Sequence, residues 1–332
     1  MAEEYLKNPD FPVIRADWEG NRLRNGRFLG EFKEGNQSML VALKWMLSKN
    51  PQREEKKKDT WLPPVTDPAA FLQGKEDGLV WLGHATFFIR LGGTTFLTDP
   101  VFYGVSYLKR KVPLPVPPEQ LPKIDYVLLS HGHMDHCDKK SLQTLRQLQQ
   151  FAVLTSLKMK TLIEPWLPET EIMEAGWYQE YVLPQPQPNV YFLPSFHWYK
   201  RGLADNNKIL WGSFLLQTPE QTLYFGADSG YDQHFKEIAQ LFPSIDTCLL
   251  GVGAYSPAFI MKPSHTNPAE AVQAFNDLGG KTLIPMHYGT FDLSDEPISE
   301  PVQWLQQLEK KGEIAGQLKI TGIGEAHLFN SH

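Results

Sequence analysis

Residues 131–136, with the sequence His-Gly-His-Met-Asp-His, decide the fold. They come directly after the apolar run 126–129 (Tyr-Val-Leu-Leu) and Ser130, so a buried strand is expected to end at this polar cluster. Three imidazoles and one carboxylate within six positions supply the nitrogen and oxygen ligands that zinc and similar divalent metals prefer. A polar surface loop is the alternative, but the whole chain has only ten histidines. The stretch therefore predicts a metal site.

The composition limits the class of protein. The chain has 332 residues, of which 42% are hydrophobic and 21% are charged, so it can bury a full core. A formal net charge of −6 argues against nucleic acid as a partner, because proteins that bind nucleic acid present a basic face. The two cysteines, Cys137 and Cys248, do not form a disulfide framework, and no signal peptide is visible at the start. We therefore expect a cytoplasmic protein.

Three apolar runs later in the chain also lead into side chains that can bind a metal. They are followed by His197, Asp228 and His287. Taken singly, such a histidine would be read as a core or surface residue, and such an aspartate as a turn residue. Their shared position after a strand favours the interpretation as ligands. Because they are far apart in sequence, one fold must bring them together.

The order of the elements indicates an α/β protein. Residues 79–98 read as two strands joined by a Gly-His turn, followed by a Gly-Gly hairpin turn into a third strand. Short turns of this kind mean antiparallel pairing, which excludes a doubly wound nucleotide-binding fold. Residues 268–278 have the pattern of an amphipathic helix. We expect two mixed sheets packed face to face, with helices outside and the site along one edge.

The domain organisation is expected to be simple. Residues 1–60 are interpreted as an N-terminal extension packed on the body, irregular over 1–37 and helical over 38–48. Residues 61–332 form one catalytic domain. The apolar run within 38–48 is too short to span a bilayer and is expected to pack on the core, with an interfacial anchor as the alternative.

Taken together, these segments resemble the metallo-β-lactamase superfamily of binuclear metallohydrolases. A narrower resemblance, to N-acylphosphatidylethanolamine-hydrolysing phospholipase D and its microbial relatives, extends over residues 10–330. The motifs that carry it are WLGHAT at 81–86, FLTDP at 96–100, NK at 207–208 through WGS at 211–213, FGADSGY at 225–231, GAYSP at 253–257 and MHYGTF at 286–291.

The resemblance implies a four-layer αβ/βα sandwich with two divalent metal ions. The ligands that it implies are His131, His133 and His197 for one ion, Asp135, His136 and His287 for the other, and Asp228 as a bridge. Zinc suits this ligand set, and iron or manganese would also be accepted. The catalytic residues are expected to be Asp135, Asp228 and His265.

The remaining histidines divide into two groups. We expect His84 to support the metal site from outside near Asp99, and His265 to line the substrate cavity, while Tyr255 has an outer or substrate-contacting role. The histidines that we expect on the surface are His234, His327 and His332.

The implied reaction is hydrolysis of a phosphodiester. Two ions bridged by Asp228 would lower the pKa of a shared water to near neutrality and neutralise the charge that develops at phosphorus during attack by the hydroxide. From the residues alone, only metal-assisted hydrolysis follows. The resemblance implies phospholipase D chemistry on an N-acylphosphatidylethanolamine-like or related phosphodiester.

Two alternatives stay open. One is a lactonase acting on a phosphorylated sugar lactone, which a pocket with lysine or arginine would favour and a long apolar channel would oppose. The other is a non-catalytic metal-binding protein. The expected partner is a small-molecule or lipid phosphodiester, with peripheral membrane contact and a monomeric or homodimeric state both compatible with the sequence.

Overall fold

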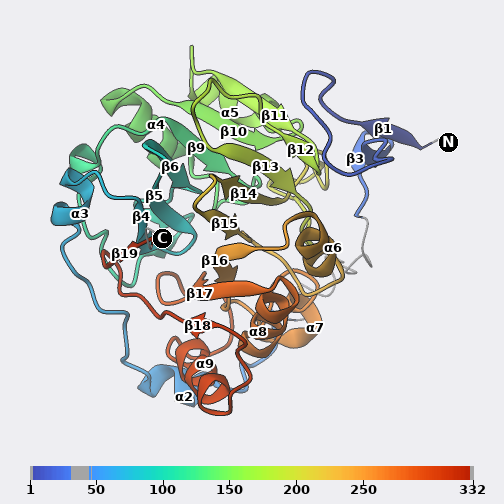
Figure 1. Ribbon diagram of the computed structural model, residues 1–332. Coiled ribbons are helices and arrows are strands. Elements are labelled where there is room, and N and C mark those ends of the chain that lie inside the picture. Colours follow the sequence, from blue (N-terminus) through green and yellow to red (C-terminus); the bar gives the residue numbers. More distant parts are fainter. Residues whose placement is uncertain (1–2, 31–44, 46, 330–332) are drawn as a thin grey trace.

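Two large mixed sheets form the body of the protein in this computed structural model, which describes residues 3–30, 45 and 47–329 (Figure 1). The first sheet has the order β11-β10-β9-β6-β5-β4-β19. Its strands are β4 (Gly78–Gly83), β5 (Thr86–Leu91), β6 (Thr94–Thr98), β9 (Tyr126–Leu129), β10 (Ala152–Ser156), β11 (Ile172–Ala175) and β19 (Ala326–Leu328). Strands β4 to β6 pair antiparallel through the expected short turns, and β6, β9, β10 and β11 pair parallel.

The second sheet has the order β12-β13-β14-β15-β16-β17-β18. Its strands are β12 (Gln179–Glu180), β13 (Asn189–Leu193), β14 (Ser213–Gln217), β15 (Thr222–Phe225), β16 (Ile245–Gly251), β17 (Gly280–Met286) and β18 (Gln317–Leu318). The first four of these strands pair antiparallel and the last four pair parallel, so β15 belongs to both halves. Both sheets are therefore mixed, as the sequence predicts.

Helices cover the outer faces of the two sheets. Figure 1 shows α4 and α5 beside the first sheet and α6, α8 and α9 beside the second. The helices are α2 (Arg53–Lys58), α3 (Ala69–Gln73), α4 (Lys139–Leu148), α5 (Lys160–Ile163), α6 (His234–Leu241), α7 (Ala258–Met261), α8 (Pro268–Asp277) and α9 (Glu300–Lys310), with 3-10 turns at Pro118–Gln120 and Glu164–Trp166. Every residue of β4 and β5 is buried, because layers lie on both faces of that sheet.

Helix starts agree with the capping chemistry of the sequence. The Asp138 carboxylate accepts a hydrogen bond from the Ser141 amide at 2.8 Å and begins α4 directly after the metal-binding stretch. Asn267 and Glu270 form a capping box at the start of α8. One large apolar cluster contains residues from both sheets and from the helices, so the ends of the strands are held by a common core.

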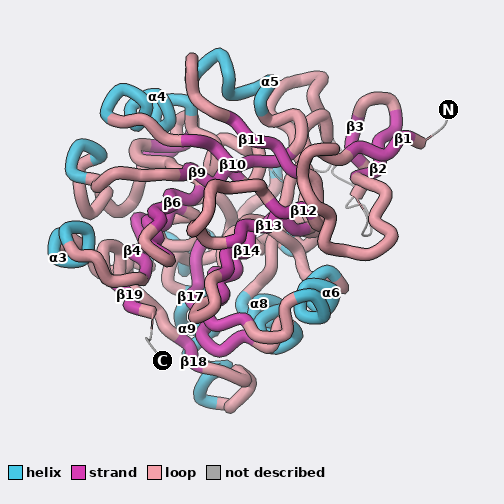
Figure 2. The backbone as a smooth tube through the Cα atoms, turned by 45° about the horizontal axis from the view of Figure 1, so that its top comes forward, coloured by secondary structure: helices cyan, strands magenta, loops and turns pink. Residues whose placement is uncertain are grey.

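The N-terminal segment is more ordered than expected. The sequence predicts an irregular arm over 1–37, but β1 (Glu4–Leu6), β2 (Asn21–Arg24) and β3 (Arg27–Phe28) form a small antiparallel sheet. This sheet lies at one side of the body (Figure 2), and the Phe28 amide donates to Asn207 O at 2.7 Å. The expected helix over 38–48 falls mostly outside the described residues, and the domain boundary at residue 60 stays a prediction.

A short hairpin of β7 (Gly104–Val105) and β8 (Leu108–Lys109) completes the described strands. Within the described part of the chain, no helix has both the length and the apolar character needed to cross a bilayer.

Candidate metal centre

The expected ligands meet at one edge of the two sheets. β9 leads into residues 131–136, β15 ends at Phe225 just before Asp228, and β17 ends at Met286, so that His287 is the next residue. Because β15, β16 and β17 are parallel, Asp228 and His287 leave the sheet at the same edge. The fold thus gathers side chains that are more than 150 positions apart in the sequence.

The first cluster consists of His131, His133, His197 and Asp228, whose ligand atoms lie within 4.8 Å of one another. Nδ1 of His133 is 3.0 Å from Nε2 of His131 and 3.0 Å from Nε2 of His197. Ligand nitrogens bound to one tetrahedral zinc ion lie about 3.4 Å apart, so these nitrogens are spaced for a shared cation.

The second cluster consists of His84, Asp135, His136 and His287, again within 4.8 Å. Oδ2 of Asp135 is 3.2 Å from Nε2 of His84, 3.6 Å from that of His287 and 3.7 Å from that of His136. The sequence assigns three of these residues as ligands and places His84 near Asp99. The structure adds a contact of His84 with the ligand Asp135.

Asp228 lies between the two clusters. Its Oδ2 is 3.1 Å from Nε2 of His136 and 3.8 Å from Nε2 of His197, while its Oδ1 is 3.1 Å from Nε2 of His287. One carboxylate thus faces ligand nitrogens of both sets. This is the arrangement that a bridging ligand requires.

Three of the histidines are oriented by hydrogen bonds from the ring nitrogen that faces away from the centre. Nδ1 of His136 donates to Asp99 at 2.7 Å, and Nδ1 of His197 donates to Ser264 O at 3.1 Å. The Ser130 hydroxyl donates to Asp99 at 2.6 Å, which leaves Nδ1 of His131, at 2.9 Å, as a donor to that hydroxyl. Each ring therefore directs its Nε2 inward, as metal ligands do.

The inward-facing atoms fit a metal ion. Nε2 of His136, Nε2 of His287 and Oδ1 of Asp228 are buried, and among the described residues none makes a hydrogen bond. Buried polar atoms without a partner are costly, and bound cations would satisfy them. Imidazole and carboxylate donors suit zinc, iron or manganese.

The charges of the cluster follow from burial and from its two carboxylates. Burial lowers the pKa of His131 and His197 well below the usual range and that of His133 to about 4, so these rings are neutral at pH 7. Burial alone would lower the pKa of His287, but the carboxylates of Asp228 and Asp135 raise it to about 9.

Against the effect of burial, the histidines lower the pKa values of the two carboxylates, those of Asp135 and Asp228. Burial alone would raise the pKa of Asp135 and Asp228, but His136 and the neighbouring imidazoles hold both pKa values well below the usual range. Both side chains are therefore ionised, so the centre attracts cations.

His265 lines the cavity at the centre, as expected. A cavity of about 380 Å³ opens over the ligands, and Nδ1 of His265 lies 3.7 Å from Oδ2 of Asp228 at its edge. Tyr255 lies elsewhere: its hydroxyl donates to Glu300 at 2.6 Å and its ring packs against Trp304 on α9. This places Tyr255 in the packing of α9 and corrects the expected role.

Sequence reasoning missed the wall of this cavity. Besides the ligands, its lining includes the apolar side chains Trp45, Met134, Trp198, Ile260 and Met261. Two of them lie on the four-residue helix α7, which is too short to show a periodic pattern. The adjacency of Met134 to Asp135 and of Trp198 to His197 is the signal that could have found the others.

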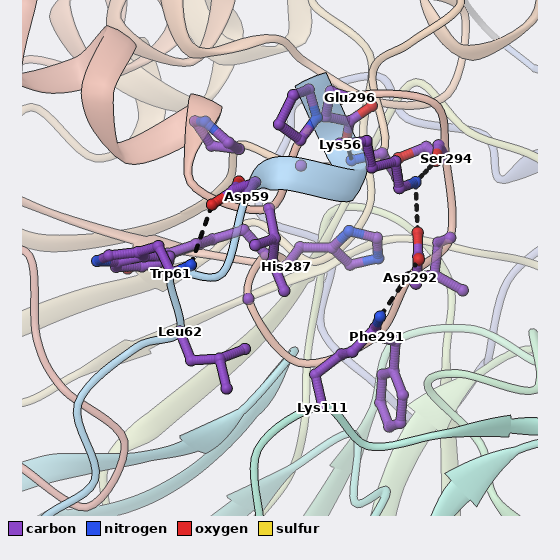
Figure 3. Close-up of a pocket in the computed structure, with 18 of the residues that line it drawn as sticks. Lys56, Asp59, Trp61, Leu62, Lys111, His287, Phe291, Asp292, Ser294 and Glu296 are labelled. Atoms are coloured by element: carbon purple, nitrogen blue, oxygen red, sulfur yellow. Dashed lines mark hydrogen bonds and ion pairs between the residues drawn. The ribbon is translucent and has the colours of Figure 1, made fainter. Parts of the chain in front are cut away.

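A second cavity, of about 200 Å³, also has His287 in its lining (Figure 3). Trp61, Leu62 and Phe291 give it apolar walls. Lys56 and Lys111 both contact the Asp292 carboxylate there, Lys111 at 3.5 Å. His287 thus belongs both to the lining of this cavity and to the second ligand cluster.

His234 is not a surface residue. The sequence analysis expects it on the surface, but its side chain is fully buried at the start of α6, where Nε2 lies 3.0 Å from the Ser229 hydroxyl. Burial lowers the pKa of His234 to about 3, so its ring is neutral. His327 is half-buried, and His332 lies outside the described residues.

Comparisons with known proteins agree with this geometry. Residues 94–288 match the beta-lactamase superfamily domain. N-acyl-phosphatidylethanolamine-hydrolyzing phospholipase D 1 of Caenorhabditis elegans is 32% identical over 254 residues, which cover 70% of this chain and 70% of the worm protein. An uncharacterized Mycobacterium tuberculosis protein is 34% identical over 252 residues, which span 73% of this chain and 66% of the mycobacterial protein.

Solved structures show the same fold at lower identity. The metallo hydrolase Igni18 of Ignicoccus hospitalis has a TM-score of 0.58 at 19% identity, covering 77% of this chain and 99% of that one. An isothiocyanate hydrolase from Delia radicum gut bacteria has a TM-score of 0.62 at 18% identity, covering 76% and 99%. The chain therefore belongs to the metallo-β-lactamase superfamily of metal-dependent hydrolases, in the branch of the N-acyl-phosphatidylethanolamine-hydrolysing phospholipases D.

Proposed function

We propose that this protein is a binuclear metal-dependent phosphodiesterase of the phospholipase D type. The observation that carries the proposal is the position of Asp228, whose Oδ2 lies 3.1 Å from Nε2 of His136 in one ligand set and 3.8 Å from Nε2 of His197 in the other. The similarity to the worm phospholipase D, 32% identical over 70% of each chain, supports the same reaction class.

The ligand assignment divides the cluster into two metal sites. One ion would be held by His131, His133 and His197, the other by Asp135, His136 and His287, and Asp228 would contact both. Two divalent ions, with zinc as the first choice, would supply an activated water and polarise a phosphoryl oxygen.

Three side chains act on the substrate and the attacking water. Ionised Asp228 and Asp135 accept hydrogen bonds from the water and keep it oriented. Burial lowers the pKa of His265 to about 4, so its neutral ring can donate one N–H to a phosphoryl oxygen at pH 7. As the bond between phosphorus and the departing alcohol oxygen breaks, that oxygen takes the proton that the attacking water gives up.

The apolar wall of the cavity supports a lipid-like substrate. Trp198, Met134 and Ile260 line it beside the ligands. Phe259, next to Ile260, is 57% exposed, and Leu47, two positions after Trp45, is 78% exposed. Exposed apolar side chains beside a site are typical of a surface that contacts lipid. We therefore propose an N-acylphosphatidylethanolamine-like or related phosphodiester as substrate, with peripheral contact to a membrane.

The alternative activities are less well supported. A phosphorylated sugar lactone would need basic side chains around its phosphate, but Lys200 is the one lysine or arginine among the described residues lining the cavity. A non-catalytic metal-binding role gives no reason for the open cavity in which His265 faces the centre. We propose a cytoplasmic protein with no nucleic-acid partner, as a monomer or homodimer.

The test is a substrate panel with the metal-loaded protein. N-acylphosphatidylethanolamine in mixed micelles, bis(4-nitrophenyl) phosphate and a phosphorylated sugar lactone would be compared in ¹⁸O-labelled water. We expect phosphatidic acid carrying one ¹⁸O on phosphorus, because water attacks phosphorus. Opening of the lactone with both phosphodiesters intact would replace the proposal with the lactonase. No turnover of any of the three would support the non-catalytic role.

A further inference from the structure

His234 and Ser229 make a buried polar contact directly behind the bridging carboxylate. Ser229 follows Asp228 in sequence, and its side chain is buried under α6. The imidazole of His234, the first residue of α6, lies with Nε2 3.0 Å from the Ser229 hydroxyl and with its ring against Phe235. Packing alone would be served as well by an apolar side chain, so the polar contact needs its own explanation.

The Ser229 hydroxyl joins the two loops that carry His197 and Asp228. Its oxygen accepts a hydrogen bond from the Phe196 amide at 2.9 Å and donates to Gly230 O at 2.8 Å. The Gly230 amide in turn donates to Phe196 O at 2.8 Å. Phe196, which precedes His197, is thereby fixed to Ser229 and Gly230, which follow Asp228.

The number of hydrogens on the Ser229 hydroxyl indicates how the His234 imidazole takes part in this contact. A hydroxyl carries one hydrogen. When that of Ser229 is directed to Gly230 O, the third contact is a donation from Nε2–H of His234. This donation fixes the rotation of the hydroxyl and leaves its remaining lone pair directed at the Phe196 amide.

We propose that His234 and Ser229 form a positioning clamp that sets the separation of His197 and Asp228 and thereby the affinity of the three-histidine metal site. Neither residue contacts the reacting atoms. The clamp rests on the proposed metal centre but requires no particular substrate. Partners that orient ligands from outside typically contribute 10- to 100-fold to metal affinity.

The geometry places the larger effect at the three-histidine site. His197 belongs to the three-histidine set, whereas Asp135, His136 and His287 are held by other contacts. A shift of the loop at Phe196 therefore moves one ligand of the first ion and none of the three terminal ligands of the second.

The test uses His234→Leu, His234→Gln and Ser229→Ala in the full chain, with zinc affinity measured by competition with a chromophoric chelator. The glutamine amide keeps an N–H donor at a similar reach, and leucine removes it. We expect the leucine and alanine variants to lose about 10-fold or more in affinity for one of the two zinc ions, and glutamine to restore most of it. The double variant should lose no more than either single variant, because both remove the same clamp.

Tyr224→Phe is the matched control. It removes a buried hydroxyl that donates to Ser213 at 3.1 Å in the same sheet and touches neither ligand loop, so both affinities should stay unchanged. Wild-type zinc affinity in the leucine and alanine variants would overturn the clamp. The clamp would also be overturned if His234→Gln and His234→Leu lost zinc affinity equally and the melting temperature of the metal-free protein fell equally in both.

The outcomes separate this inference from the proposed function. If the wild-type protein binds two zinc ions but hydrolyses no phosphodiester, the proposed function fails and the clamp is still measured by affinity. If the wild-type protein binds no zinc, the clamp fails as well.

Discussion

The carboxylate of Asp99 lies 2.7 Å from Nδ1 of His136, and both side chains are fully buried. The same carboxylate accepts from the amide and the hydroxyl of Ser130. Asp99 therefore fixes the ring of His136 with Nε2 facing Asp228, in the manner of the carboxylate–histidine–metal arrangement.

Asp99→Ala is expected to weaken binding of the ion held by His136 by about 10- to 100-fold, because the ring loses its orienting partner. Metal affinity by chelator competition is the measurement. Asp125→Ala is the control, since that carboxylate accepts hydrogen bonds from the amide and the hydroxyl of Thr95 in the same sheet. An unchanged affinity in Asp99→Ala would contradict the orienting role.

His84→Leu tests the contact between His84 and the ligand Asp135. Burial lowers the pKa of His84 to about 3, so the neutral ring donates Nε2–H to Oδ2 of Asp135 at 3.2 Å. We expect kcat/KM to fall about 10-fold or more, and His84→Gln, which keeps an N–H, to recover most of the loss. The absorption spectrum of the cobalt-substituted protein should keep its intensity in His84→Gln. Equal loss of activity in both variants would argue against a donor role.

Metal binding is expected to release protons at pH 7. In the metal-free protein the carboxylates raise the pKa of His287 to about 9 and that of His136 above its usual range, against the effect of burial. Both rings must lose a proton to bind metal, so about two protons should leave per chain at pH 7. Calorimetric titration in buffers of different ionisation enthalpy measures this number. Zinc uptake at pH 7 without proton release would show that these rings are neutral beforehand.

The same pKa shift sets the stability of the metal-free protein. A histidine whose folded pKa is raised stabilises the fold below its unfolded pKa, near 6.5, and this contribution is lost as the pH rises through the folded value. For His287 the loss falls between about pH 6.5 and 9. Urea unfolding of the metal-free protein should therefore show a free energy of unfolding that declines as the pH rises across this window. Metal affinity should rise over the same range. A flat profile would refute the assignment.

Phe259→Ser tests the proposed lipid-contacting surface, which consists of the exposed side chains of Phe259 and Leu47. We expect a higher KM for N-acylphosphatidylethanolamine in vesicles, because an exposed aromatic side chain next to Ile260 of the cavity lining is lost. The kinetics on bis(4-nitrophenyl) phosphate, which is soluble, should not change. Val182→Ser is the matched control, since Val182 is 58% exposed and follows β12 in the chain. Equal effects of both substitutions would show that Phe259 has no specific role in contact with the lipid.

The sequence predicts the fold and the ligands because both are local signals at strand ends. The apolar run before residues 131–136 becomes β9, and His287 follows β17 as expected. His234 could not be placed, since its burial depends on how α6 packs over Ser229, a contact that its own sequence neighbours do not reveal. Tyr255 was misplaced for a related reason, because its partner Glu300 lies 45 positions away on α9.

The measurement that tests the central claim most directly is the metal content of the purified protein by elemental analysis, paired with phosphodiester hydrolysis, for the wild type and Asp228→Ala. Asp228 faces His136 in one ligand set and His197 in the other, so its removal should lower metal occupancy and abolish cleavage. About two metal ions per wild-type chain, with cleavage lost in the variant, is the result that we expect. A wild-type protein without stoichiometric metal, or an Asp228→Ala variant with full metal and full activity, would contradict the bridged binuclear centre.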